Sequence, residues 1–158
     1  MISKMTTEAV KAICSWRYPL PYDVYNYVSF DEAIENKSPL LEVENADNYI
    51  CFWDDEILIA YISIYKKEDC VFIGIGLAPD YCSKGLGKYY LKQGIATAKI
   101  RYPNDRIWIQ VRSWNIRAIR CYESCGFKEQ CRKIIKDRFG NDTEFVHMRL
   151  ESEKYKND

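Results

Sequence analysis

The chain has 158 residues, with 23 lysines and arginines, 23 aspartates and glutamates, and a formal net charge of zero at pH 7. This length suits one domain with a sizeable core, which we expect to span residues 1–150 and to be followed by a frayed, charged tail at 151–158. Because basic residues are spread along the chain and no apolar run approaches the length of a membrane span, we expect neither nucleic acid nor a membrane as the main partner.

The chain contains seven cysteines, an odd number. Several lie inside apolar runs and none belongs to a Cys-x-x-Cys pair, which is typical of buried, reduced thiols rather than disulfides. A metal site built from Cys121, Cys125, Cys131 and His147 would have unsuitable spacing, and we expect no bound metal. The first residues also lack the apolar core of a signal peptide, so we expect the protein in the cytoplasm.

The amino-terminal part of the chain is predicted to form a short strand at residues 2–5. A helix capped by Thr6 or Thr7 follows it. A second short helix is expected between Ser29 and Ser38.

The segment at residues 16–27 lies between these two helices and is dense in aromatic side chains. Pro19 and Pro21 exclude a regular helix at this point. Two interpretations remain open: the segment packs as a loop over the edge of the core, or it forms one wall of a substrate pocket.

From Tyr49 onward the hydrophobic pattern changes from helical to alternating. Residues 49–53 and 57–65 are predicted to form a β-hairpin, and a polar turn leads into a third strand at 70–77. An amphipathic helix follows this strand, and the alternating residues 106–112 form the next one. A strand, a helix and a strand in this order predict a right-handed parallel crossover.

The carboxy-terminal part is predicted to contain one more helix and two more strands. Asn115 caps the helix and Gly126 ends it. The strands are expected at 127–136 and 143–150, with Gly140 in the turn between them. The oligomeric state stays open, although these last strands can pair between two chains in a homodimer.

A polar, glycine-rich turn joins the strand at 70–77 to the helix after it. Gly85 and Gly87 stand at the start of that helix, with Lys84 and Lys88 beside them. The first backbone N–H groups of a helix have no partner within it, and the helix dipole favours negative charge there. The turn is therefore predicted to bind an anion such as phosphate.

Two common phosphate-binding motifs do not fit this turn. A Walker loop needs Ser or Thr after its lysine, but Lys88 is followed by Tyr89, and Cys82 stands in place of the first glycine. A dinucleotide fingerprint that starts at Gly74 would need a glycine where Pro79 stands.

The segment from Cys82 to Gly87, with the sequence CSKGLG, resembles the acyl-CoA-binding loop of the GNAT superfamily of N-acetyltransferases. That loop usually reads Gln or Arg, two residues, Gly, one residue, and Gly or Ala, so Cys82 is a departure that supplies no long polar side chain. A second resemblance covers residues 111–127. There, an Asn after the strand, an Ala-Ile pair one turn later, a Tyr and a Gly-Phe pair match the family's second CoA-contacting segment.

The resemblance implies an α/β (α+β) fold with a mixed, mostly antiparallel central sheet of about six to seven strands, about four flanking helices and a splayed central strand pair. It also implies acetyl-CoA as the acetyl donor, with the pantetheine arm between the splayed strands and the pyrophosphate on the backbone amides of the turn. The cofactor-binding residues implied in this way are Leu77, Ala78, Cys82, Ser83, Lys84, Gly85, Leu86, Gly87, Lys88, Asn115, Ala118 and Tyr122.

The activity implied by the resemblance is transfer of an acetyl group from acetyl-CoA to a primary amine, by direct attack in a ternary complex. Such a transfer needs a donor for the developing oxyanion and a proton for the leaving thiolate. The family's geometry implies the backbone N–H of Leu77 as the oxyanion donor and Tyr122 as the general acid. No general base is assigned, because residues 70–78 contain no carboxylate.

A small-molecule amine is the slightly favoured acceptor, because the aromatic segment can close a compact pocket and Asp23 can attract a cationic amine. One alternative is a protein or peptide acceptor, acetylated at its N-terminus or on a lysine. A second alternative is a non-catalytic module that binds or senses acyl-CoA; the missing carboxylate keeps it open, whereas Tyr122 argues against it. The candidate substrate-binding residues are Tyr18, Tyr22, Asp23 and Tyr25.

Overall fold

Seven strands form one mixed sheet in the computed structural model, which describes residues 1–151. The strand order is β1-β2-β3-β4-β5-β7-β6. The β1–β2, β2–β3, β5–β7 and β6–β7 pairs are antiparallel, whereas β4 and β5 are parallel. The predicted mixed, mostly antiparallel sheet is therefore confirmed. The strands are β1 (Ile2–Ser3), β2 (Tyr49–Asp54), β3 (Ile57–Lys67), β4 (Cys70–Leu77), β5 (Arg106–Arg112), β6 (Phe127–Lys136) and β7 (Asp142–Leu150).

The described chain also contains four α-helices, as predicted, and four short 3₁₀ helices. The α-helices are α1 (Thr7–Ser15), α2 (Phe30–Glu35), α3 (Leu86–Arg101) and α4 (Ile116–Ser124). The 3₁₀ helices are η1 (Tyr22–Tyr25), η2 (Pro39–Leu41), η3 (Val43–Asn48) and η4 (Pro79–Tyr81). None of the helices within residues 1–151 combines the length and the hydrophobicity needed to cross a lipid bilayer.

The chain divides into two compact units. Among the described residues, unit 1 comprises Met1–Ser63 and Ile75–Tyr90, and unit 2 comprises Ile64–Gly74 and residues 91–151. The division passes through β3, β4 and α3, so that each unit contains part of these elements. The single domain expected over residues 1–150 stays a prediction, and the expected tail lies outside the described residues except for Glu151.

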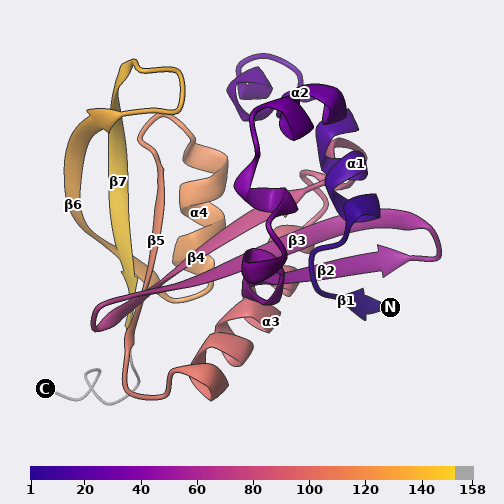
Figure 1. Ribbon diagram of the computed structural model, residues 1–158. Helices are drawn as coiled ribbons and strands as arrows, with labels where there is room; N and C mark the ends of the chain where they lie inside the picture. Colours follow the sequence, from indigo (N-terminus) through magenta and orange to yellow (C-terminus); the bar gives the residue numbers. More distant parts are fainter. Residues whose placement is uncertain (152–158) are drawn as a thin grey trace, which may run out of the picture. The chain divides into compact units, whose positions relative to one another are not determined.

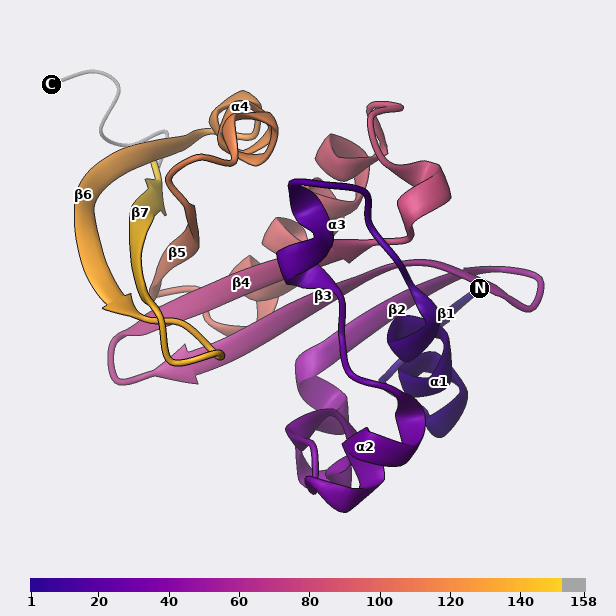
Figure 2. The ribbon, with the colours of Figure 1, turned by 90° about the horizontal axis from the view of Figure 1, so that it is seen from above.

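Unit 1 is built on the β1, β2 and β3 strands, with α1 and α2 beside one another (Figures 1 and 2). The side chain of Thr6 caps α1 by accepting a hydrogen bond from the N–H of Ala9 at 3.1 Å, and Ser29 caps α2 in the same way. The Thr6 cap agrees with the prediction, and α2 lies between Ser29 and Ser38 as expected. Residues of α1 that recur at helical spacing, Val10 and Ile13, are buried. The predicted first strand is shorter than expected, because only Ile2 and Ser3 pair with β2.

Unit 2 contains β5, β7 and β6 side by side, with α4 next to them (Figure 1). Successive residues of a strand point to opposite faces, and on β5 the buried residues alternate. Ile109 pairs with Met148 and Val111 with Val146, and all four side chains are buried on one face. The other face carries polar and aromatic residues that remain partly accessible.

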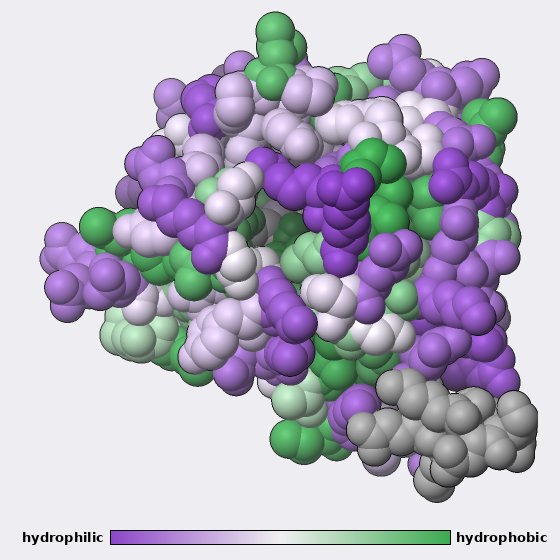
Figure 3. All heavy atoms as spheres, turned by 180° about the vertical axis from the view of Figure 1, so that it is seen from behind, coloured by the Kyte–Doolittle hydropathy of each residue, from purple (hydrophilic) through white to green (hydrophobic). Residues whose placement is uncertain are grey.

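Strand β6 is the edge of the sheet and is exposed along almost its whole length. Phe127 is its one buried residue. Hydrophilic side chains gather along this edge, on the right of the face drawn in Figure 3. Charged residues on an exposed edge strand oppose uncontrolled pairing with other chains.

A buried ion pair stabilises the turn between β6 and β7. The guanidinium of Arg112 lies 3.3 Å from the carboxylate of Asp137, and the exposed fractions of the two side chains are 10% and 5%. The same carboxylate accepts hydrogen bonds from the N–H groups of Phe139 and Asn141 and from the hydroxyl of Thr143. These bonds, that of Asn141 foremost, hold the pKa of Asp137 below its usual value although desolvation opposes them.

Candidate functional site

The carboxyl end of β4, in unit 1, is bounded by aromatic side chains. A Cβ atom added to Gly76 would lie 2.2 Å from Cε1 of Tyr61, so this position accepts glycine alone while the ring stays in place. The Tyr61 ring stacks on Trp16, with centroids 6.0 Å apart and an interplanar angle of 15°. It also meets Tyr49 at 6.1 Å. Tyr61 is not among the residues predicted from the sequence. The one available signal is the pair of alternating glycines on β4, which leaves room for a large side chain over one face of the strand.

Tyr18 brings the aromatic segment to the same strand end. Its hydroxyl donates a hydrogen bond to the carbonyl of Leu77 at 2.6 Å, and its N–H donates to the side chain of Asn26 at 2.7 Å. Trp16 and Tyr18 thus pack within unit 1, on Tyr61 and at the end of β4, as the loop interpretation predicts. The structure places the other three candidates, Tyr22, Asp23 and Tyr25, on η1, where they are half-buried or exposed.

The backbone N–H groups along β4 point alternately to the two edges of this strand. The N–H of Ala78 donates to the carbonyl of Ile59 on β3 at 2.8 Å. Neighbouring residues of a strand direct their N–H groups to opposite edges, so the N–H of Leu77 points away from β3. This direction is compatible with the predicted oxyanion donor and excludes Ala78 from the same role.

The glycine-rich turn has two positive φ angles before α3 begins at Leu86. Ser83 has φ 60° and Gly85 has φ 77°, and left-handed residues of this kind turn successive N–H groups towards one concave side. A Cβ added to Gly85 would meet nothing within 4 Å, so the approach to its backbone is open. This local geometry is compatible with the predicted binding of an anion at the amino end of α3.

Cys82 does not reach outward from the turn. Its Sγ lies 3.6 Å from the carbonyl oxygen of Ala78 and 3.9 Å from that of Leu77, so the thiol points back to the strand end. The ammonium of Lys84 lies 5.7 Å from the centre of the Tyr81 ring. If the turn binds an anion as predicted, backbone amides rather than a side chain at position 82 would contact it.

The second predicted segment lies in unit 2 and is organised around α4. Asn115 is buried, and its Oδ1 accepts a hydrogen bond from the N–H of Ala118 at 3.1 Å, which confirms the predicted cap. Tyr122 is 8% exposed, and its ring meets Phe127 at 6.4 Å. Gly126 ends the helix with φ 101°. These residues adopt the predicted local structure, while their roles towards acetyl-CoA stay predictions.

No group of three or more His, Cys, Asp or Glu side chains suited to a metal ion occurs in the part of the chain that the structure describes. All seven cysteines are free thiols. Burial raises the pKa of Cys51 to about 12 and also raises that of Cys14. Both thiols are therefore protonated and unreactive at neutral pH.

The family model described as the acetyltransferase (GNAT) family matches residues 10–127. This range covers well over half of the chain. The chain belongs to the GNAT acetyltransferase family. The resemblance noted at the glycine-rich turn and at residues 111–127 is thereby confirmed, and both segments lie inside the matched range.

Curated relatives within the GNAT family are ribosomal protein bS18 alanine N-acetyltransferases. The protein from Salmonella typhimurium is 32% identical over 76 residues, which cover 48% of this chain and 51% of the relative. The protein from Escherichia coli K12 is 34% identical over 70 residues, covering 39% and 41% of the two chains. The chain thus matches about half the length of these relatives at most.

Solved GNAT structures share the whole fold at lower sequence identity. A chimera of the spermidine N-acetyltransferase SpeG from Vibrio cholerae with hSSAT superposes with a TM-score of 0.74, at 19% identity, over 100% of this chain and 99% of the other. The ribosomal-protein-S18-alanine N-acetyltransferase from Escherichia coli gives a TM-score of 0.64 and 23% identity over 95% and 92%. These likenesses confirm the predicted GNAT-like fold.

Proposed function

We propose that this GNAT protein transfers an acetyl group from acetyl-CoA to a primary amine. The observation that carries this proposal is the turn between β4 and α3, where Ser83 and Gly85 adopt positive φ and the backbone at Gly85 is open. GNAT proteins use acetyl-CoA as their acetyl donor, and the turn lies within the family match.

The residues of the turn fit the pyrophosphate of acetyl-CoA. The backbone N–H groups between Cys82 and Gly87 would hold its oxygens, with Lys84 and Lys88 adding positive charge. Leu77 and Ala78, at the end of β4, are the residues proposed to lie along the pantetheine arm. In unit 2, the residues proposed to contact acetyl-CoA are Asn115, Ala118 and Tyr122.

Acetyl-CoA supplies an activated thioester, and the protein supplies hydrogen bonds and a proton. The N–H of Leu77, which points away from β3, is the proposed donor to the developing oxyanion. The hydroxyl of Tyr122 is the proposed source of the proton for the leaving thiolate. The amine attacks directly in a ternary complex, so that no protein side chain carries the acetyl group.

A small-molecule amine is the proposed acceptor. The packing of Trp16 and Tyr18 against the end of β4 supports this choice, because it fixes part of the aromatic segment close to the proposed oxyanion donor. Asp23, exposed on η1, would attract a cationic amine. The spermidine acetyltransferase among the structural neighbours is compatible with such an acceptor.

A protein N-terminus is the second candidate acceptor. It is favoured by the curated relatives, which act on the alanine of ribosomal protein bS18. An extended peptide needs an open groove at the aromatic segment, and the exposure of Tyr25, at 38%, leaves η1 available for such contacts.

The deciding experiment supplies acetyl-CoA and a panel of amines and detects acetylated products by mass spectrometry. The panel contains spermidine, aminoglycosides, amino acids and short peptides, including one that begins with alanine. Product detection is preferable to a thiol-reactive dye because the seven free cysteines include the exposed Cys131. We expect a small amine to be acetylated. Acetylation of the peptides alone would move the proposal to a protein acceptor, and no product from any amine would refute the transferase function.

A further inference from the structure

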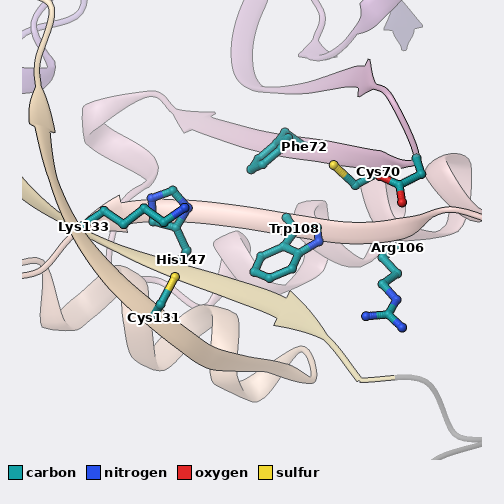
Figure 4. Close-up of a pocket in the computed structure, with 8 residues that line it drawn as sticks. Cys70, Phe72, Arg106, Trp108, Cys131, Lys133 and His147 are labelled. Carbon is teal, nitrogen blue, oxygen red and sulfur yellow. The ribbon is translucent and has the colours of Figure 1, made fainter.

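Unit 2 carries a cavity of about 430 Å³ on the partly accessible face of its strands (Figure 4). It is lined by residues of four strands, among them Phe72 of β4, Trp108 of β5, Lys133 of β6 and His147 of β7. Trp108 stands between the buried Ile107 and Ile109, so its side chain points to the opposite face. The volume lies within the range of about 300–1,000 Å³ that is usual for small-molecule sites.

The floor of this cavity is aromatic. Phe72 and Trp108 are direct partners in the parallel pairing of β4 and β5, so their side chains are neighbours on one face. Figure 4 shows the two rings in the middle of the cavity. The guanidinium of Arg149 lies 5.8 Å from the centre of the Trp108 ring. Such a floor suits a flat, apolar body.

The two ends of the cavity differ in charge. Arg106 stands at one end, where Cys70 is its strand partner and the adjacent Asp69 supplies a carboxylate. Lys133 extends towards His147 at the other end (Figure 4). Asp69 is the single carboxylate among the lining residues, so the end at Lys133 and His147 has a net positive charge.

Polar groups at this positive end lack partners. Within residues 1–151, the ammonium of Lys133 has no ion-pair partner, and the buried Nε2 of His147 has no hydrogen bond. A buried polar atom without a partner destabilises the fold, so such an atom calls for an explanation. Cys131, the strand partner of His147, offers only a weak acceptor.

We propose that this cavity binds an aromatic carboxylate, with its ring on Phe72 and Trp108 and its carboxylate between Lys133 and His147. The carboxylate oxygens would accept a charge-assisted hydrogen bond from the ammonium of Lys133 and would lie beside the imidazole of His147. A cationic amine would meet repulsion from Lys133, so this ligand differs in charge from the acceptors considered for acetyl transfer. The proposal does not depend on the acetyltransferase activity.

The single histidine of the chain makes this proposal directly measurable, because all imidazole NMR signals come from His147. Burial lowers the pKa of His147, and the positive charge of Lys133 lowers it further. A bound carboxylate adds a negative charge beside the ring and therefore raises this pKa. The probes are benzoate and indole-3-acetate, and the matched controls are benzamide and indole-3-acetamide, which keep the rings without the charge.

We expect the carboxylates to shift the His147 signals saturably and to raise the pKa of His147, and the amides to leave both unchanged. Lys133→Gln should weaken benzoate binding about tenfold, as expected for loss of one charge-assisted hydrogen bond. Lys128→Gln removes the same charge from the same strand, at a side chain 70% exposed, and should bind as the unaltered chain does.

Three results would overturn the proposal. An absence of any saturable shift of the His147 signals would mean that the cavity does not take these ligands. An equal response to benzamide would mean that the cavity recognises rings without regard to charge. An equal loss of affinity in Lys128→Gln and Lys133→Gln would attribute the effect to overall charge.

Discussion

Gly85 and Gly140 have the same local geometry at very different places in the chain. Their φ angles are 77° and 82°, and in both cases an added Cβ would meet nothing within 4 Å. An alanine in this left-handed conformation costs about 1–2 kcal/mol of stability. Gly85→Ala and Gly140→Ala should therefore lower the melting temperature by similar amounts.

Only the change at Gly85 should affect the affinity of the protein for acetyl-CoA. Its new methyl group would occupy the space through which the pyrophosphate reaches the backbone amides. A hydrogen bond to a charged group contributes about 1.5–3 kcal/mol, so we expect Gly85→Ala to weaken binding about tenfold or more in calorimetric titration. Equal affinities of the two variants would show that the turn does not hold the pyrophosphate.

Tyr122 can be tested by removing one oxygen atom. Its ring is buried against Phe127, so Tyr122→Phe keeps the packing and deletes the hydroxyl. If the hydroxyl is the general acid, turnover should fall about 100-fold or more, whereas the affinity for acetyl-CoA should change little. Tyr89→Phe, at a ring 57% exposed, is the control. Unchanged turnover in Tyr122→Phe would remove this residue from the mechanism.

The residues around Gly76 show how far single positions can be predicted. Two glycines alternate on β4, and this pattern indicates a close neighbour on one face. The pattern does not indicate that the neighbour is Tyr61, because the facing residue depends on the register of β3 against β4. Tyr18 can be named from its aromatic surroundings, but its hydrogen bond to Leu77 spans 59 residues and has no local signal.

At the scale of elements, Asn115 has an observed structural role as the cap of α4 and a proposed role as a contact to acetyl-CoA, and the two can be tested separately. The side chain caps the helix, and Asn115→Ala should cost about 1 kcal/mol of stability. Asn115→Ser retains a cap and should leave the melting temperature nearly unchanged. If Asn115 also contacts acetyl-CoA, Asn115→Ser should still weaken acetyl-CoA binding. Equal binding by Asn115→Ser and the unaltered chain would limit this residue to the cap.

The turn between β6 and β7 should make stability depend on pH. The pKa of Asp137 is lower in the folded chain than in the unfolded one, so the carboxylate stabilises the fold above the unfolded pKa, about 4. That contribution is lost as the pH falls through the lower, folded pKa. Asp137→Asn should reduce the melting temperature by several degrees at pH 7, and the difference from the unaltered chain should shrink in acid.

The control for this change is Asp142→Asn, in the same hairpin. Asp142 pairs with Lys136 at 2.7 Å, but both side chains are more than two-thirds exposed, at 69% and 68%. Exposed ion pairs contribute little, so this variant should melt close to the unaltered chain at every pH. A Tm loss for Asp137→Asn that does not change between pH 7 and acid would exclude the carboxylate as its cause.

Most elements could be predicted from periodicity and from caps. Strands β4, β5 and β6 have the predicted bounds, while β2, β3 and β7 each begin or end within two residues of expectation. Periodicity and capping residues are local signals, which is why they sufficed there. The 3₁₀ helices η2 and η3 could not be predicted in this way because residues 39–48 have no apolar periodicity, and Val43 is 86% exposed.

At the scale of the whole molecule, two short motifs are enough to indicate the family from the amino-acid sequence. The turn at 82–87 and the segment 111–127 lie in different parts of the chain, and both are inside the family match. The residues proposed to bind acetyl-CoA are inferred from these two motifs. The cavity of unit 2 has no such signal, because its lining residues come from four strands and meet only through the register of the sheet.

The central claim is that the chain binds acetyl-CoA through the turn between β4 and α3. Calorimetric titration of the folded protein with acetyl-CoA tests it most directly, with CoA, ATP and NADH as comparison ligands. We expect saturable binding of acetyl-CoA and CoA in preference to ATP and NADH, together with the loss of affinity described for Gly85→Ala. Absence of binding to acetyl-CoA and CoA by a protein shown to be folded would contradict the claim.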